Sequence, residues 1–248
     1  MKNFKILVCA GVLATMGLNA MAVTLYDNSP SYNGTLMQMQ NGLQVGNEIT
    51  FHPGNLWNLT HFGFEYYTSQ AANFNPLLGV DVRFYAQTGP TSGGYPTPAP
   101  TPFWDSGWYY NTLLNNIPSG VGAHEINYTA ADLYGGSLNG SVNMAPTFLM
   151  PAEFTFTITF TNVGSDIIDL ALAANQTTGQ SSGFATTYGN YWRNTAGSWS
   201  LLTNSVAPNA GPANFVAIFE GVPEPSVLGL GAMGGALLLG VNKLRRKR

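Results

Sequence analysis

An unbroken period-two run constrains the fold of this chain more than any other feature. Residues 154–161 read FTFTITFT, so apolar and polar side chains alternate over eight residues. Because successive side chains of a β-strand point to opposite faces of a sheet, the run predicts a strand with one buried face and one polar face.

Shorter alternating runs recur between Gly, Pro and Asn residues, and each predicts a further strand: residues 47–51, 59–67, 80–85, 167–173, 197–202 and 215–220. In the run at 80–85, Val82 and Phe84 are expected to face inward, and Asp81 and Arg83 outward. Residues 88–101 predict a loop, 194–197 a hairpin turn and 130–133 a single helical turn. Together these elements predict an all-β fold, a two-sheet antiparallel sandwich resembling a jelly roll.

The N-terminus has the pattern of a secretory signal peptide. Lys2 and Lys5 precede an apolar segment at 6–18, and Ala20 and Ala22 form a small-residue cleavage site before Val23. We therefore expect residues 1–22 to form a signal helix that signal peptidase removes. The single cysteine lies inside this leader, so the mature chain is expected to contain no disulfide bond.

The last 27 residues, 222–248, combine a proline motif, an uncharged segment and a basic end. The motif is Val222, Pro223, Glu224 and Pro225, and its prolines favour an extended backbone. As a helix, residues 227–241 would span roughly 22 Å, which is short for a hydrocarbon core of about 30 Å and predicts a marginal, temporary membrane anchor. The basic end is expected to stay in the cytoplasm; it contains Lys243, Arg245, Arg246, Lys247 and Arg248. A C-terminal core helix is the alternative.

This order of motif, short membrane helix and basic tail resembles the PEP-CTERM sorting signal of Gram-negative bacteria. The resemblance implies that an exosortase recognises Pro223, Glu224 and Pro225, after transient anchoring in the inner membrane. It also implies an exported protein of the cell surface or extracellular matrix, linked to exopolysaccharide and biofilm. Under this interpretation the domains are 1–22, 23–221 and 222–248. The body resembles those of other PEP-CTERM proteins, which imply no particular activity.

The net negative charge of the expected mature domain disfavours some classes of binding partner. Residues 23–222 contain eleven acidic side chains and two basic ones, Arg83 and Arg193, a formal charge of −9. A surface of that sign disfavours nucleic acid and anionic membranes as partners. Solubility is expected to depend on the abundant neutral polar residues instead.

Aromatic side chains provide the candidate binding residues. Trp104, Trp108 and Tyr110 are separated by even numbers of residues, so they would lie on one face of an extended segment. Trp192 lies beside the expected hairpin. Flat rings with polar neighbours can stack on sugar faces, so these four residues are candidate glycan contacts. Burial in the core is the alternative for each of them.

Evidence for catalysis is weaker, and we expect a non-catalytic protein without a cofactor. Residues 179–183 match the G-x-S-x-G pattern, but no strand–helix unit surrounds it. The three histidines, His52, His61 and His124, form no metal motif. An extracellular enzyme acting on polysaccharide remains the competing hypothesis. A Ca²⁺ site is a further alternative, for which the candidate carboxylates are Asp105, Asp132, Asp166 and Asp169.

The threonines of the period-two run support a third hypothesis. Thr155, Thr157, Thr159 and Thr161 would form a regular row on one face of the strand. Ice-binding proteins use such rows, and the PEP-CTERM tail is also known as an ice-binding protein C-terminal domain. An ordinary solvent-facing strand surface is the alternative, since threonine suits strands.

Overall fold

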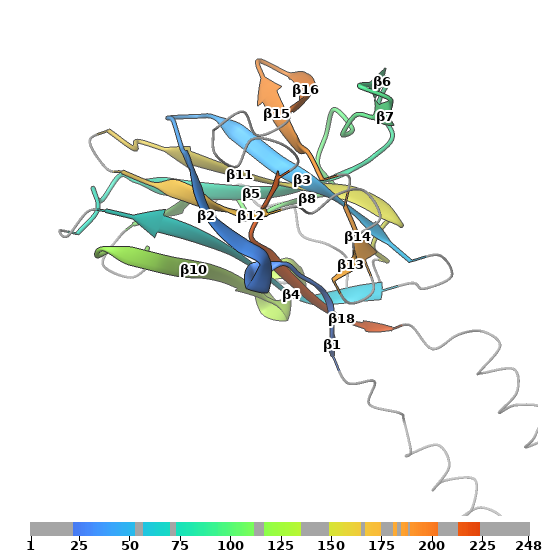
Figure 1. Ribbon diagram of the computed structural model, residues 1–248, viewed down its shortest axis with the longest axis horizontal. Coiled ribbons are helices and arrows are strands. Elements are labelled where there is room, and N and C mark those ends of the chain that lie inside the picture. Colours follow the sequence, from blue (N-terminus) through green and yellow to red (C-terminus); the bar gives the residue numbers. More distant parts are fainter. Residues whose placement is uncertain are drawn as a thin grey trace, which may run out of the picture.

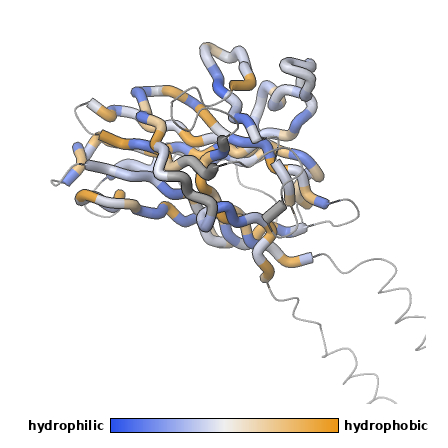
Figure 2. Tube along the Cα trace, in the orientation of Figure 1, coloured by the Kyte–Doolittle hydropathy of each residue, from blue (hydrophilic) through white to orange (hydrophobic). Residues whose placement is uncertain are grey.

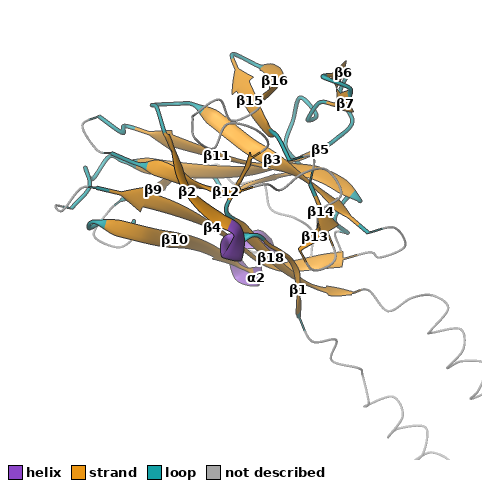
Figure 3. Cartoon of the chain, in the orientation of Figure 1, coloured by secondary structure: helices purple, strands orange, loops and turns teal. Residues whose placement is uncertain are grey.

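The computed structural model describes residues 22–52, 57–69, 73–111, 117–134, 149–164, 167–174, 181–182, 185–187, 189–202 and 213–223. Antiparallel strands dominate these residues, which confirms the expected all-β class (Figure 3). The helical elements here are η1 (Ser29–Ser31) and α2 (Ala130–Tyr134). No helix in the described part of the chain is long and apolar enough to cross a membrane. The expected signal helix and the segment at 227–241 lie outside the described residues.

The first sheet is built around the long strand β4 (Trp57–Thr68). One edge of β4 pairs with β10 (Gly122–Thr129), and the other pairs with β18 (Ala217–Pro223) and β12 (Asp169–Ala174). The described strands that complete this sheet are β1 (Val23–Asp27) on β18, with β2 (Tyr32–Gln38) and β17 (Ala213–Phe215) on β12.

The second sheet is centred on β11 (Glu153–Thr161), which pairs with β3 (Gln44–Phe51) and β5 (Gly79–Ala86). Two short strands, β8 (Trp104–Asp105) and β9 (Tyr109–Tyr110), pair with β5. The strands beyond β3 are β14 (Ala185–Thr186), β13 (Ser181–Ser182), β15 (Tyr191–Thr195) and β16 (Ser198–Leu202). A small hairpin, β6 (Thr91–Ser92) and β7 (Tyr95–Pro96), lies within the segment expected to be a loop.

The two sheets face each other across an aromatic core (Figure 1). Phe62 of β4 lies 5.5 Å from Phe156 of β11 and 5.2 Å from Phe84 of β5, measured between ring centroids. Phe219 of β18 contacts Phe156 at 5.5 Å. Aromatic pairs of this kind contribute about 0.5–1.5 kcal/mol each beyond the area that they bury. Hydropathy alternates along the strands accordingly (Figure 2).

The threonine row of β11 is covered, so the expectation of a solvent-facing row was wrong. Thr155 and Thr157 have no exposed surface, and Thr159 is 8% exposed. Longer side chains from the flanking strands bond to them: Gln44 of β3 donates to the Thr157 hydroxyl at 3.0 Å, and Thr155 donates to Gln87, which follows β5, at 2.8 Å. A row beneath such side chains cannot present a plane to ice.

Both ends of the described domain lie in the first sheet. Strand β1 begins at Val23, where the sequence predicted the mature N-terminus. Strand β18 extends to Pro223, so the expected domain boundary after residue 221 falls inside a strand. Val222 lies opposite Asn58 and Pro223 opposite Trp57. Proline is tolerated at this position because it ends the strand, where a missing amide donor costs little.

Two local predictions are confirmed. The hairpin turn between β15 and β16 places Ala196 and Gly197 at positive φ, and the amide of Gly197 donates to the Asn194 side chain at 2.8 Å. The expected helical turn is α2, and the Asp132 side chain caps its N-terminus. The Asp132 carboxylate accepts hydrogen bonds from the Thr129 amide at 2.8 Å and from its hydroxyl at 2.7 Å.

Candidate functional site

Three consecutive aromatic residues, Trp108, Tyr109 and Tyr110, lie at the β9 edge of the second sheet. Tyr110 is opposite Gly79 of β5, and its ring covers that residue. A β-carbon added to Gly79 would come within 3.0 Å of two Tyr110 ring atoms. Glycine at this position therefore allows the ring to lie flat against the sheet.

Trp108 and Tyr110 form a near-parallel pair on the outer side of this edge. Their ring centroids are 6.3 Å apart with an interplanar angle of 30°, and both residues are partly exposed. Two rings with similar orientation form an apolar platform beside polar backbone groups. This is the kind of surface on which the flat face of a sugar ring stacks.

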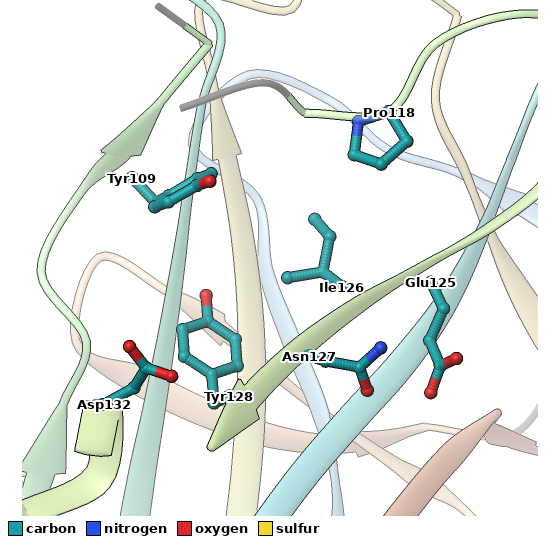
Figure 4. A pocket seen from close by; sticks show the side chains of 7 residues that line it. All are labelled: Tyr109, Pro118, Glu125, Ile126, Asn127, Tyr128 and Asp132. Atoms are coloured by element: carbon teal, nitrogen blue, oxygen red, sulfur yellow. The ribbon is translucent and has the colours of Figure 1, made fainter. Parts of the chain in front are cut away.

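A pocket of about 360 Å³ lies between Tyr109 of β9 and the edge strand β10. Trp108 and Tyr110 are not among its lining residues, because alternate residues of a strand point to opposite faces. Figure 4 shows the residues that line it: Tyr109, Pro118, Glu125, Ile126, Asn127, Tyr128 and Asp132. Its volume falls within the range of about 300–1,000 Å³ that is common for small-molecule sites. Apolar walls and a few polar groups meet here, as ligand recognition requires.

Tyr128 forms the inner wall of the pocket. It is 3% exposed, and its ring lies 5.5 Å from Trp104 and 6.0 Å from Phe62. Burial raises the pKa of Tyr128 above its usual value, although the nearby Ser106 hydroxyl opposes this rise. The Ser106 hydroxyl itself donates to the Gly107 carbonyl at 2.8 Å.

The two carboxylates of the pocket project from different elements. Glu125 extends from β10 on the side opposite to Tyr128, whereas Asp132 extends from α2 (Figure 4). Asp132 lies close enough to add to the rise that burial causes in the pKa of Tyr109. Because these two carboxylates do not face each other across the pocket, they do not form the opposed pair that glycoside hydrolysis requires.

The structure brings two of the four predicted glycan contacts together and buries the other two. Trp108 and Tyr110 form the platform described above. Trp104 and Trp192 have no exposed surface, so their assignment as glycan contacts was wrong. Trp104 does not share a face with Trp108 and Tyr110, because Gly107 adopts a φ of 65° and turns the chain between β8 and β9. Trp104 consequently packs on Phe84, with ring centroids 4.5 Å apart.

A comparison with known protein families, curated proteins and solved structures finds no match. The chemistry of the site must therefore be argued from its own residues. The sequence analysis missed Tyr109, Tyr128 and the pocket, although a signal was present. Ile126 and Tyr128 alternate with Glu125 and Asn127, as expected for an edge strand with one buried face.

The carboxylates considered for calcium do not converge. Asp105 accepts from the amide of Gly107 and contacts Arg83, Asp132 caps α2, and Asp169 lies in β12 of the other sheet. Asp166 lies outside the described residues. Within the described ranges, no group of three or more acidic, histidine or cysteine side chains is arranged to hold a metal ion.

The remaining motif residues occupy structural positions. Ser181 and Ser182 of the G-x-S-x-G pattern form β13, which pairs antiparallel with β14 and so lacks the parallel strand context of a nucleophile elbow. His124 contacts the Gly120 carbonyl at 2.8 Å and packs on Tyr66. His61 contacts the Asn127 side chain at 2.7 Å.

An ion-pair cluster covers the middle of β5. Arg83 is 2.8 Å from Asp81 and 2.9 Å from Asp105, measured from nitrogen to oxygen. Asp81 belongs to the expected outer face but is only 1% exposed. Burial raises the pKa of Asp81 to about 7, with Arg83 opposing the shift and Asp105 adding to it. These contacts fix Arg83 to the sheet, and Arg83 is not among the residues that line the pocket.

Proposed function

We propose that this chain is an exported, non-catalytic protein of the cell surface or extracellular matrix that binds polysaccharide at the β9 edge. Its body is a jelly-roll-like sandwich carried between an N-terminal signal helix and a C-terminal membrane helix. Signal peptidase removes the leader, and an exosortase processes the C-terminal signal near Pro223, Glu224 and Pro225. The motifs at both ends of the sequence support this route.

The observation that supports polysaccharide binding best is the platform of Trp108 and Tyr110. The two rings are partly exposed, and their centroids lie 6.3 Å apart. A sugar unit of a polymer can stack on these rings. The acidic surface of the domain favours neutral or cationic polymers over polyanions.

Glycan-array binding of the full-length chain tests this proposal. We expect binding to at least one polysaccharide, and we expect Trp108→Ala and Tyr110→Ala each to weaken it by about fivefold or more, as loss of a stacking ring implies. Tyr67→Ala is the matched control, because Tyr67 is a partly exposed aromatic residue on β4 of the other sheet. Absence of binding to every polysaccharide would refute the binding proposal.

Mass spectrometry of the exported protein tests the sorting route. The expected product begins at Val23 and lacks the basic end. Detection of an intact C-terminus at Arg248 in the exported protein would contradict processing by an exosortase. Retention of the full-length chain in the cytosol would contradict export itself.

A further inference from the structure

A buried threonine and a buried glutamine meet on the face of the second sheet that points away from the aromatic core. The Thr155 hydroxyl of β11 donates to the side-chain oxygen of Gln87 at 2.8 Å, although the two residues are 68 positions apart in the chain. Thr155 has no exposed surface, and Gln87 is 8% exposed. A hydroxyl nucleophile and a carboxamide therefore touch where bulk water is largely excluded, so an ester formed between them would be shielded from hydrolysis.

Two hydrogen bonds hold the amide of Gln87 in one orientation. Its nitrogen donates to the Pro96 carbonyl at 2.9 Å, while its oxygen accepts from Thr155. Because a carbonyl bond is about 1.2 Å long, the Thr155 oxygen lies no more than about 4 Å from the carbonyl carbon of Gln87. Reacting atoms poised for attack are about 3–3.5 Å apart, so the pair needs only a small movement to react.

The carboxyl group of Glu153 lies beside this pair. Glu153 and Thr155 are alternate residues of β11, so their side chains point to the same face of the sheet. The Glu153 backbone carbonyl accepts from the Gln87 amide at 3.4 Å, and its side-chain Oε1 is buried without a hydrogen-bond partner among the described residues. Burial raises the pKa of this carboxyl, which makes its ionised form a stronger proton acceptor. Glu153 is therefore placed to accept the proton of the threonine hydroxyl.

Glu48 of β3 lies directly opposite Thr155 in the ladder. Its side chain is fully buried and accepts a hydrogen bond from Thr50, and burial raises the pKa of its carboxyl well above the usual value. Attack on an amide places negative charge on the carbonyl oxygen, and a neutral carboxyl does not repel that charge. The surroundings of Thr155 thus tolerate this oxyanion better than two ionised carboxylates would.

We propose that Thr155 and Gln87 become joined by an ester bond that the chain forms by itself. The hydroxyl proton of Thr155 passes to the Glu153 carboxylate while Oγ1 bonds to Cδ of Gln87. The bond between Cδ and Nε2 then breaks, and the nitrogen leaves as ammonia with the proton that Glu153 returns. Each cross-link releases one ammonia molecule and consumes no oxidant or co-reactant. Ammonia is protonated in neutral water and diffuses away, which favours the ester.

This bond takes the place of a disulfide in a domain that has none. Residues 23–223 contain no cysteine. The ester connects β11 with the segment that follows β5 and closes a long loop, so it restricts the unfolded chain as a disulfide does and stabilises the fold. The inference concerns the body of the domain and does not depend on polysaccharide binding.

Mass spectrometry of the purified full-length chain tests the inference, with the termini identified by peptide mapping. We expect the denatured protein to be lighter than its sequence by the mass of one ammonia molecule. The map should contain residues 87 and 155 in one cross-linked fragment. Thr155→Val removes the nucleophile and keeps the size of the side chain, so it should restore the full mass and yield separate peptides.

Thr157→Val is the matched control. Thr157 lies on the same face of β11, is equally buried and also contacts a glutamine, but here the Gln44 amide nitrogen donates to the hydroxyl at 3.0 Å. Because the nitrogen faces the hydroxyl, this pair should not react, and Thr157→Val should keep the cross-link. Glu153→Gln should slow the loss of ammonia after synthesis by about 100-fold or more, as removal of a general base implies.

Three results would contradict the proposal. A wild-type protein of full mass would overturn it, and that measurement does not depend on whether any variant folds. Loss of ammonia that persists in Thr155→Val would also overturn it, because a succinimide at an asparagine–glycine site such as Asn41 would then explain the mass. Loss of ammonia at the wild-type rate in Glu153→Gln would refute the role of Glu153 as the base.

Discussion

Val23 and Gly221 lie opposite each other in the antiparallel ladder between β1 and β18. The expected first residue of the mature chain is thus a neighbour of the residue that precedes the proposed sorting motif. Strand β18 lies between β1 and β4, so it is an interior strand of the first sheet. The fold is therefore complete only when the chain is present through the end of β18, and processing that preserves the fold must occur beyond it.

Truncation tests this dependence on β18. A chain spanning 23–223 should fold and unfold cooperatively, because it retains every described strand. A chain spanning 23–216 should fail to fold, because it loses an interior strand and exposes two unpaired edges, on β1 and β4. Circular dichroism and thermal melting measure the difference. Cooperative unfolding of the shorter chain would contradict the prediction.

Phe219 should be among the most costly core residues to truncate. Its ring contacts five aromatic side chains from both sheets: Tyr26, Phe62, Phe84, Phe154 and Phe156. We expect Phe219→Ala to lower the free energy of unfolding by about 3–5 kcal/mol, since the space left behind cannot collapse fully. Urea denaturation measures this loss. Ile218→Ala, at the partly exposed neighbouring position, should cost clearly less.

Much of the strand pattern could be predicted from the sequence, because strands with one face in the core tend to alternate apolar and polar residues. Strand β11 follows the FTFTITFT run, with Phe154, Phe156, Ile158 and Phe160 fully buried. The hairpin turn and the helical turn could be predicted as well, because their turn and capping residues act locally. These features depend on neighbours along the chain, which the sequence shows.

Features that depend on distant partners could not be predicted. The threonine row is covered by Gln44 of β3 and by Gln87, which follows β5, and the sequence of β11 alone gives no sign of either. Both residues of the platform, Trp108 and Tyr110, were predicted as glycan contacts, but the turn at Gly107 separates them from Trp104, which was expected on the same face. The pocket forms only when β9 and β10, from different sheets, come together.

Two buried asparagines, Asn28 and Asn47, are another feature that only the structure reveals. Asn47 of β3 accepts a hydrogen bond from the Phe215 amide at 2.7 Å, and Asn28 accepts one from the Ala217 amide at 2.8 Å. These side chains satisfy backbone donors on either side of Val216, where the chain passes from β17 to β18. They replace strand partners at an interruption in the sheet.

Replacing Asn47 should therefore destabilise the fold. Asn47→Leu leaves the buried Phe215 amide without its acceptor, and we expect a loss of about 1–3 kcal/mol in the free energy of unfolding. Chemical denaturation measures it. Asn41→Ala is the control: Asn41 accepts from the Asn162 amide at an exposed position, where water can replace it. Equal losses in the two variants would contradict the role assigned to Asn47.

Glu48 should make the stability of the fold depend on pH. Its side chain is fully buried on β3, and burial raises the pKa of its carboxyl well above the usual value of 4.5. The hydrogen bond from Thr50 opposes this shift, whereas Glu153 adds to it. The folded protein therefore holds a proton on Glu48 more tightly than the unfolded chain does.

The sign of the pH effect follows from this difference in proton binding. Below pH 4.5 both states are protonated, so the contribution of Glu48 is fully present. As the pH rises from 4.5 toward the raised pKa, the unfolded chain releases its proton first and stability falls. Glu48→Gln should remove this loss and so stabilise the protein at neutral pH relative to the wild type, as thermal melting between pH 4 and 8 would show. A parallel profile for wild type and Glu48→Gln would contradict the assignment.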